Sequence, residues 1–234
     1  GHAAACPFFK FVVMKRSVRF LGVLIFLFIS AGLSGQIITT DPAIPVAGEP
    51  VTIYFDATQG TGGLQDFTGE VYAHTGVLTG SSSGTSDWKY VKTDWGENTA
   101  DTKLSRVSAN VYSLEISPTI RDYYGVPAGE TITHMAFVFR SADASLEGKD
   151  DGGKDIFVEV FEEGLNVSIS LPDRNKVVDQ GTNVAFEAAA SETATLTLYL
   201  NNAEVKSLSG TSLTHTFNFA GSGDNWIRIT ATTA

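Results

Sequence analysis

A two-residue alternation of apolar and polar side chains is the feature that most constrains how this chain can fold. It recurs in short runs after Gln36, for example in VTIYFDA from Val51 and in VYSLEI from Val111. Successive side chains of a β-strand point to opposite faces, so each run predicts a strand with one buried face. Turns rich in Gly, Ser, Asn and Asp separate the runs, and long apolar helical runs are missing. We therefore predict an all-β chain built as immunoglobulin-like β-sandwiches.

Two tandem sandwiches are predicted, with the acidic segment EEG at residues 162–164 as the hinge between them. The first spans residues 36–162, and its run MAFVF at 135–139 is apolar on both faces, which predicts a central strand. The second spans residues 163–234. Because the sequence stops at TATTA, in or just after a strand, we expect this second sandwich to be truncated and the chain to be the N-terminal part of a longer protein.

Two local signals interrupt the strand pattern. In SPTIRDYYG, Ser117 can cap a helix, Pro118 can occupy its first turn and Gly125 can end it, so we predict one or two helical turns there. In the second sandwich, Asn201-Asn202 suits the tight turn of a β-hairpin.

Residues 1–35 have the composition of a targeting segment. Lysine and arginine follow Met14, an apolar stretch fills residues 20–33, and Ser34-Gly35 supplies small residues, which predicts a secretory signal peptide cleaved before Gln36. The alternative is a membrane anchor, but the apolar stretch is shorter than the ~18–20 residues of a spanning helix. Residues 1–13 fit neither a leader nor a domain and are predicted to lie upstream of the true start. We expect a protein that is secreted or held at the cell surface, with no membrane contact after cleavage.

Charge and cysteine usage exclude several classes of function. The chain carries 16 basic and 26 acidic residues, and the first 35 residues contain four of the bases and none of the acids. A strongly acidic mature chain repels phosphate backbones, so nucleic-acid binding is not expected. The one cysteine, Cys6, lies upstream of Met14, so the mature chain has no disulfide, thiol nucleophile or cysteine metal site.

Signatures of an enzyme are nearly absent. His74, His134 and His215 lie far apart in the sequence and lack metal-ligand spacing. The segment GSSSG at 80–84 matches G-x-S-x-G, but a nucleophile elbow needs a helix after it, and a Ser/Gly loop is predicted here. No pair of carboxylates is set apart for glycoside hydrolysis. We therefore predict no catalysis within this chain and no cofactor.

The DDGGKD segment is a weak calcium candidate. Asp150, Asp151 and Asp155 could supply carboxylate ligands. They do not follow the EF-hand spacing, and a solvated turn before an edge strand explains the same residues, which is the interpretation we favour.

Aromatic residues between positions 72 and 95 form the strongest candidate binding site. Tyr72 and His74 face away from the apolar side of their predicted strand, and Trp88, Tyr90 and Trp95 lie in a polar, glycine-flanked stretch. A flat indole can stack on the C–H face of a sugar ring while a nearby imidazole bonds its hydroxyls. The alternative places one or both tryptophans in the sandwich core, and spacing alone does not separate the two.

Four segments of the chain carry a resemblance to known modules. They are VTIYFDA, VYAHTGV, the stretch around Trp88, and MAFVFRSADASLEGKDDGGKDIFVEV. Residues 37–162 resemble the N-terminal module of secreted Bacteroidetes α-amylase-type glycoside hydrolases. They are also similar to the starch-binding immunoglobulin-like modules of carbohydrate-binding families 25, 26 and 53. Tyr72, His74 and Gly76 match the "Y-x-H-x-G" strand of those families, and the residues that match "F-x-F-x-D-G" loosely are Phe137, Phe139 and the turn at 150–153.

The resemblance implies binding of an α-glucan polysaccharide by His74, Trp88 and Trp95. The turn at 148–153 lacks the tryptophan of the family pattern "W-D-N-N-G-G", so one wall of the usual site is missing or is supplied by Trp95 or Tyr90. The second unit, which begins GLNVSISLPD, is similar to the immunoglobulin-like spacer that precedes the catalytic barrel of such enzymes. None of that barrel is present in this sequence.

The leading hypothesis is a non-catalytic starch-binding region that raises the local substrate concentration for a downstream catalytic domain of the same chain, which we expect to be monomeric. The alternative, from the structural class, is a pair of spacer or adhesion modules without a ligand. A third hypothesis, an enzyme in its own right, requires a catalytic constellation that the sequence does not contain.

Overall fold

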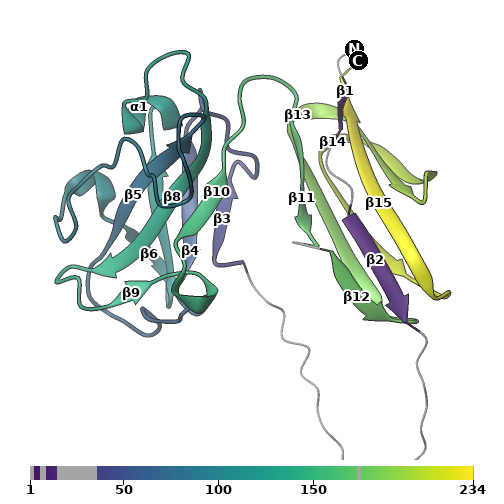
Figure 1. Ribbon diagram of the computed structural model, residues 1–234, viewed down its shortest axis with the longest axis horizontal. Helices are drawn as coiled ribbons and strands as arrows, with labels where there is room; N and C mark the ends of the chain where they lie inside the picture. The colour runs from purple at the N-terminus through teal and green to yellow at the C-terminus, as the bar shows by residue number, and fades with distance from the viewer. Residues whose placement is uncertain (1–2, 6–8, 15–35, 173–174, 234) are drawn as a thin grey trace, which may run out of the picture. The chain divides into compact units, whose positions relative to one another are not determined.

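The structure is a computed structural model that describes residues 3–5, 9–14, 36–172 and 175–233 (Figure 1). Strands dominate it and its helices are short, which confirms the all-β prediction. The described residues form two compact units, a first unit of residues 36–163 and a second unit of residues 164–233 together with the N-terminal strands. The signal-peptide prediction lies outside the described residues. Within the described ranges, no helix is long and apolar enough to cross a membrane.

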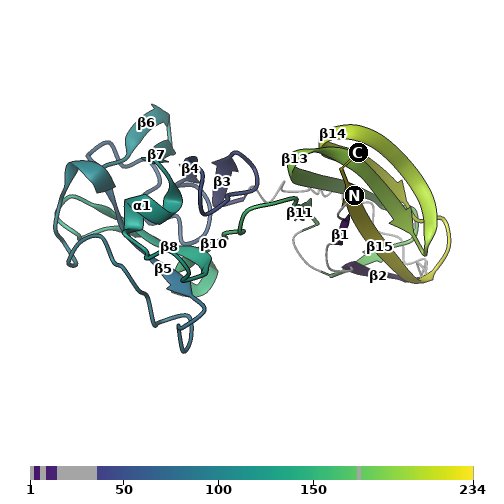
Figure 2. The same cartoon turned by 90° about the horizontal axis from the view of Figure 1, so that it is seen from above.

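The first unit contains two four-stranded antiparallel sheets, which lie in separate layers (Figure 2). One sheet has the order β3-β4-β7-β6, and its strands are β3 (Ile38–Asp41), β4 (Val51–Asp56), β6 (Ser105–Ser108) and β7 (Val111–Ile116). The other has the order β10-β8-β5, with β9 paired to β8, and its strands are β5 (Val71–Thr79), β8 (Ile132–Ser141), β9 (Glu147–Gly148) and β10 (Ile156–Glu159). The short helices of the unit are η1 (Ala100–Thr102), α1 (Ile120–Tyr124) and η2 (Asp151–Gly153).

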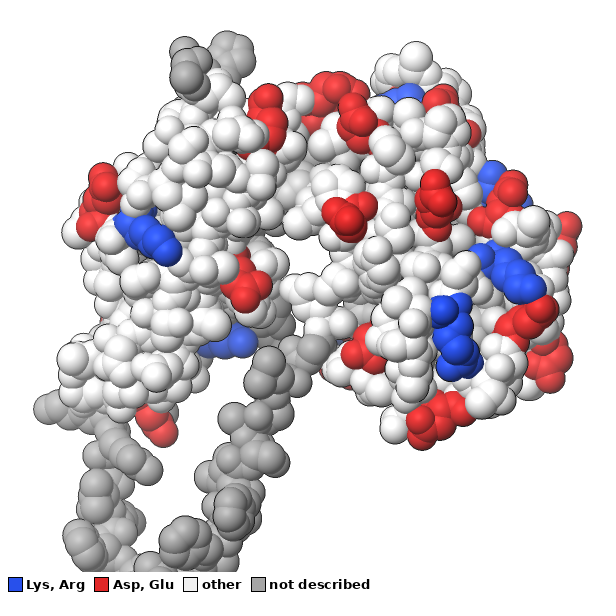
Figure 3. Space-filling model, turned by 180° about the vertical axis from the view of Figure 1, so that it is seen from behind, with Lys and Arg blue, Asp and Glu red and all other residues white. Residues whose placement is uncertain are grey.

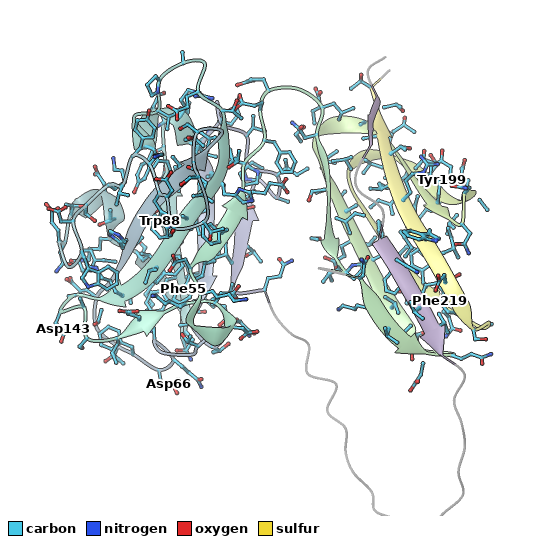
Figure 4. The ribbon with its side chains drawn as sticks, in the orientation of Figure 1. Phe55, Asp66, Trp88, Asp143, Tyr199 and Phe219 are labelled. Atoms are coloured by element: carbon cyan, nitrogen blue, oxygen red, sulfur yellow. The ribbon has the colours of Figure 1, made fainter. Side chains whose placement is uncertain are left out.

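The core of the first unit is a stack of aromatic rings between these sheets. Phe55 from β4 lies 4.1 Å from Phe139 of β8 between ring centroids, and Phe139 lies 5.6 Å from Phe137. All three side chains have at most 1% of their surface exposed. The prediction of a central strand at residues 135–139 is confirmed, because β8 runs between β5 and β10 and each of these residues is buried. Phe55 is labelled in Figure 4.

The predicted short helix is present as α1, but its N-cap differs from the predicted one. Thr119, not Ser117, caps it, since the Thr119 hydroxyl accepts a hydrogen bond of 2.9 Å from the Asp122 amide. Pro118 therefore lies before the cap, outside the first turn. Gly125 ends the helix as predicted, with a left-handed φ of 72°.

The second unit is built on one seven-stranded sheet, in which five strands have the order β11-β13-β15-β2-β12, while β1 pairs with β15 and β14 pairs with β13. Its strands are β1 (Ala3–Ala5), β2 (Phe9–Met14), β11 (Val167–Leu171), β12 (Lys176–Asp179), β13 (Asn183–Leu200), β14 (Ala203–Asn218) and β15 (Gly223–Thr232). The hairpin prediction is confirmed, because Asn201 and Asn202 join β13 to β14 with φ values of 50° and 69°.

The structure places part of the N-terminal segment in the second unit, where the sequence predicts no domain for residues 1–13. Strand β2 pairs with β15 on one side and with β12 on the other. Phe11 is fully buried, and its ring centroid lies 5.5 Å from that of Phe219. The alternation of Phe11 and Val13 with polar or less buried neighbours is the same two-residue pattern that marks the other strands.

We expect Phe139→Ala to lower the free energy of unfolding of the first unit by about 3–5 kcal/mol, because it leaves a cavity beside Phe55 and Phe137. Urea unfolding followed by tryptophan fluorescence measures the change. Val107→Ala on β6, where 56% of the side chain is exposed, is the matched control and should shift stability by less than about 0.5 kcal/mol. Equal effects of the two substitutions would contradict an aromatic core built around Phe139.

Candidate functional site

The outer face of the β10-β8-β5 sheet carries small residues at its centre. In β5, Val71, Ala73 and Val77 point into the core, so His74 and Gly76 point outward. The register places Gly76 opposite Ala136, and Ala136 opposite Phe157. The two small residues leave space above the sheet between the side chains of His74 and Phe157.

The segment after β5 returns along the same strand and covers this space. Lys89 exchanges two backbone hydrogen bonds with Val77, of 2.7 and 2.9 Å. Gly76 permits this close approach, since a Cβ there would lie only 3.0 Å from the Lys89 carbonyl oxygen. Trp88, labelled in Figure 4, comes just before this pairing, and its indole Nε1 donates to the Thr85 carbonyl at 2.9 Å.

Four aromatic side chains, which we call the aromatic strip, lie in sequence across this face: Trp95, His74, Trp88 and Phe157. The ring centroids of Trp95 and His74 are 5.2 Å apart, those of His74 and Trp88 are 5.7 Å apart, and those of Trp88 and Phe157 are 6.4 Å apart. Trp95 is 49% exposed, and the other three are partly exposed. Beneath the strip, Ala136 is fully buried. The strip therefore covers the sheet and presents ring surface to solvent.

The loop that carries Trp95 is fastened to β8 by Arg140. This side chain is fully buried, and its guanidinium donates to the Asn98 side-chain oxygen at 2.8 Å and to the Glu97 carbonyl. Gly96, with a φ of 86°, lets the chain turn back directly after Trp95. Arg140 Nε is buried without a hydrogen-bond partner in the described part of the chain. Burying a cation is costly, and the hydrogen bonds to Asn98 and Glu97 offset part of this cost while they tie the loop to β8.

A groove of about 590 Å³ opens beside Trp95. It is lined by His74, Val91, Lys92, Thr93, Asp94, Trp95 and Glu97. Two of its polar atoms, His74 Nδ1 and Thr93 Oγ1, are buried and have no hydrogen-bond partner among the described residues. Leaving a buried polar group unpaired costs about 1–3 kcal/mol, so the wall of this groove is a place where stability is lost.

The environment keeps His74 neutral. Burial lowers the pKa of its imidazole below the usual 6.5, and the positive charge of Arg140 lowers it further, while the carboxylates of Asp155 and Asp94 oppose the change. A neutral imidazole has one donor and one acceptor nitrogen, which is the pairing that a sugar hydroxyl can use.

Of the five binding residues that the sequence predicts, the structure brings three together, His74, Trp88 and Trp95. Tyr72 lies outside the strip because it is only 7% exposed, with its hydroxyl donating to Glu70 at 2.9 Å. Tyr90 lies outside it too, since its ring packs against the core and its hydroxyl donates to Glu130 at 2.5 Å.

Two residues of this face are absent from the candidates that the sequence suggests. Phe157 on β10 completes the aromatic strip, and His134 on β8 lies beside it, with ring centroids 6.3 Å apart. The alternation that places Ile156 and Val158 in the core also assigns Phe157 to the outer face, so the outward direction of Phe157 could be predicted from the sequence. His134 follows from the same alternation, because Met135 points inward.

The calcium candidates take part in local contacts. The Asp150 carboxylate accepts a hydrogen bond of 2.8 Å from the Asp151 amide, and Asp155 lies 3.8 Å from the Lys149 ammonium. The described ranges contain no group of three or more carboxylate, histidine or cysteine side chains that could hold a metal ion.

The G-x-S-x-G match forms a turn that supports Trp88. The Ser82 hydroxyl donates to the Asp87 carbonyl at 2.9 Å and accepts from the Thr79 amide at 3.0 Å. Ser83 donates to the Asp87 carboxylate through its amide and its hydroxyl. These serines therefore fix the residue next to Trp88.

We expect Arg140→Lys to loosen the Trp95 loop, since a lysine cannot reproduce the forked hydrogen bonds to Asn98 and Glu97. In a protein whose one remaining tryptophan is Trp95, with Trp88→Phe and Trp226→Phe, acrylamide quenching of fluorescence should increase. Arg228→Lys in the second unit, where the guanidinium lies 4.0 Å from the Tyr199 ring, is the matched control and should leave quenching unchanged. If quenching is unchanged in both variants, Arg140 does not hold the Trp95 loop in place.

The depressed pKa of His74 predicts a specific pH dependence of stability. The unfolded state binds a proton at His74 more readily than the folded state, so the His74 contribution is fully present above pH 6.5 and is lost as the pH falls below it. His74→Gln should flatten the decrease in unfolding free energy just below pH 6.5, as measured by urea unfolding across that range.

Asp143→Asn is the matched control for this pH profile. Hydrogen bonds from Ser141 and Ser145 lower the pKa of Asp143 to about 2 from the usual 3.8. Its contribution is present above pH 3.8 and is lost below it, so this variant should change the profile only in the more acidic range. A His74→Gln profile parallel to that of the wild type near pH 6 would contradict the burial of a neutral imidazole.

No protein-family model matches this chain, and no curated protein is significantly similar to it. Among solved structures, the chain is similar to the secreted serine protease VesC from Vibrio cholerae, with 11% identity over 81% of this chain and a TM-score of 0.20. The match spans 44% of the length of that protein. A TM-score this low carries no argument about fold or activity, so the function has to be inferred from the residues of the chain itself.

Proposed function

We propose that this chain is a non-catalytic α-glucan-binding region of a secreted amylolytic glycoside hydrolase. The first unit binds starch through the aromatic strip and thereby holds a downstream catalytic domain near its substrate. The observation that carries this proposal is the row of partly exposed rings from Trp95 to Phe157 on one sheet face.

The angles between the rings favour a curved ligand. His74 and Trp88 are within 25° of parallel, whereas Trp95 is tilted by 79° to His74 and Phe157 by 79° to Trp88. A flat, ribbon-like β-glucan stacks best on coplanar rings. The helical turn of an α-1,4-linked glucan presents successive sugar faces at an angle, which suits a cradle with two steep walls.

The charges around the strip favour a neutral polysaccharide. The groove beside Trp95 contains Asp94 and Glu97, and Glu159 lies exposed on β10. The ammonium of Lys92, which also lines the groove, is engaged by the Tyr123 carbonyl at 2.7 Å. Figure 3 draws the side away from the viewer of Figures 1 and 4, and there too acidic side chains are spread over both units and basic ones are fewer. Uronic-acid polymers and sulfated glycans would be repelled, while starch would not.

A ligand-free spacer or adhesion role is the second candidate, and one observation favours it. Trp88 is packed against His74 on the sheet and is fastened through its Nε1, as a purely structural tryptophan would be. This hypothesis leaves the exposure of Trp95 and the unpaired Thr93 hydroxyl without a role.

Affinity electrophoresis in gels cast with soluble starch tests the proposal, with cellulose-derivative gels as the polysaccharide control. We expect starch to retard the full chain and Trp95→Ala to weaken the retention about tenfold, the scale of a contact worth 1.4 kcal/mol. Trp226→Ala is the matched control, because Trp226 is 45% exposed in the second unit and lies outside the strip. If no glucan changes the mobility of the wild type, the result supports the spacer hypothesis instead.

A further inference from the structure

The aromatic strip extends past the position that one sugar stacked at Trp95 and His74 would occupy. Strand β8 separates β5 from β10, and Phe157 and Gly76 both lie opposite Ala136, so these two residues are roughly 10 Å apart across the sheet, with His74 two residues further along β5. This span exceeds the width of one pyranose ring. Trp88 bridges it, with one ring contact to His74 and another to Phe157.

The Phe157 side of Trp88, which we call the far side, carries the same kinds of side chain as the His74 side, which we call the near side. On the near side a tilted ring, Trp95, stands beside an imidazole, His74, at 5.2 Å. On the far side a tilted ring, Phe157, stands beside an imidazole, His134, at 6.3 Å, and the two rings are 88° apart. Each imidazole has its Nδ1 buried without a hydrogen-bond partner among the residues described.

A carboxylate completes the polar groups of the far side. The register places Glu159 of β10 opposite His134 of β8, and Glu159 is exposed. Its oxygens are acceptors, and the imidazole nitrogens of His134 are groups that can hydrogen-bond to a sugar hydroxyl. A flat ring with donors and acceptors at its edge is the arrangement that suits a second sugar residue.

We propose that Phe157, His134 and Glu159 form a second sugar subsite, so that the strip binds a linear α-glucan segment of at least three glucose units. The segment passes from Trp95 over Trp88 to Phe157, across the strands. This inference rests on the proposed function and adds to it the length of the ligand and the residues at its far end. The tilt of both end walls, 79° at Trp95 and 79° at Phe157, matches a chain that curves.

Isothermal titration of the full chain with maltose, maltotetraose and maltoheptaose tests the second subsite. For the wild type we expect the affinity to rise about tenfold from maltose to maltotetraose. Phe157→Ala should abolish this rise and leave the maltose affinity within twofold, because the near side is intact. Trp95→Ala should weaken the binding of every sugar in the series.

Thermal unfolding of a Phe157→Leu variant distinguishes loss of the second subsite from a folding defect. Leucine keeps most of the apolar volume at position 157 and removes the flat ring, so this variant should melt near the wild type and still lose the dependence on chain length. His134→Phe should reduce that dependence too, since it keeps a ring and removes both nitrogens.

The outcomes separate this inference from the proposed function. If the wild type binds these sugars and both Phe157 variants keep its chain-length dependence, the second subsite is wrong while α-glucan binding stands. An equal loss for maltose and maltoheptaose in the stably folded Phe157→Leu protein would also overturn the subsite. If no sugar of the series binds to the wild type, both proposals fail.

Discussion

The register between β5 and β8 is the constraint on which both the core and the candidate site of the first unit depend. It pairs His74 with Val138 and Gly76 with Ala136, while the alternate residues of the same strands fill the core. A slip by one residue would exchange the two faces of β5, so the inward positions would hold His74 and the outward ones would hold Val77. The Phe55–Phe139 stack fixes which face of β8 points inward, and burial of Val71, Ala73 and Val77 fixes the face of β5.

The buried guanidinium of Arg140 ties the surface loop that carries Trp95 to β8. Arg140 lies on the outer face of β8 and is fully buried, and no ion pair within the described ranges offsets its charge. Its hydrogen bonds go to Asn98 and to the Glu97 carbonyl, and its guanidinium carbon lies 5.6 Å from the Tyr72 ring. The loop that carries Trp95 thus depends on a polar anchor, because the exposed indole offers it little apolar burial.

Local patterns were sufficient for much of the fold. Alternation located the central strands but was not applied to β2, asparagines located the β13–β14 hairpin, and Gly125 located the end of α1, since each signal depends on a few neighbouring residues. The site was only partly predictable. Phe157 joins the strip through pairing between β10 and β8, which brings together residues about 20 positions apart, and no local signal reports that pairing. Tyr90 has a φ of 50°, so its side chain leaves the direction that alternation with Trp88 implies.

Unpaired buried polar atoms distinguish the face that carries the aromatic strip from a surface that serves only for packing. His74 Nδ1, His134 Nδ1 and Thr93 Oγ1 are each buried without a partner in the described structure. A face evolved only for packing would replace such groups with apolar ones at little cost, because removing both members of a hydrogen bond is nearly neutral whereas leaving one unpaired is not. All three atoms lie beneath or beside the aromatic strip. The unpaired atoms and the exposed rings therefore coincide on one face, which is the balance that the proposed ligand-binding surface would require.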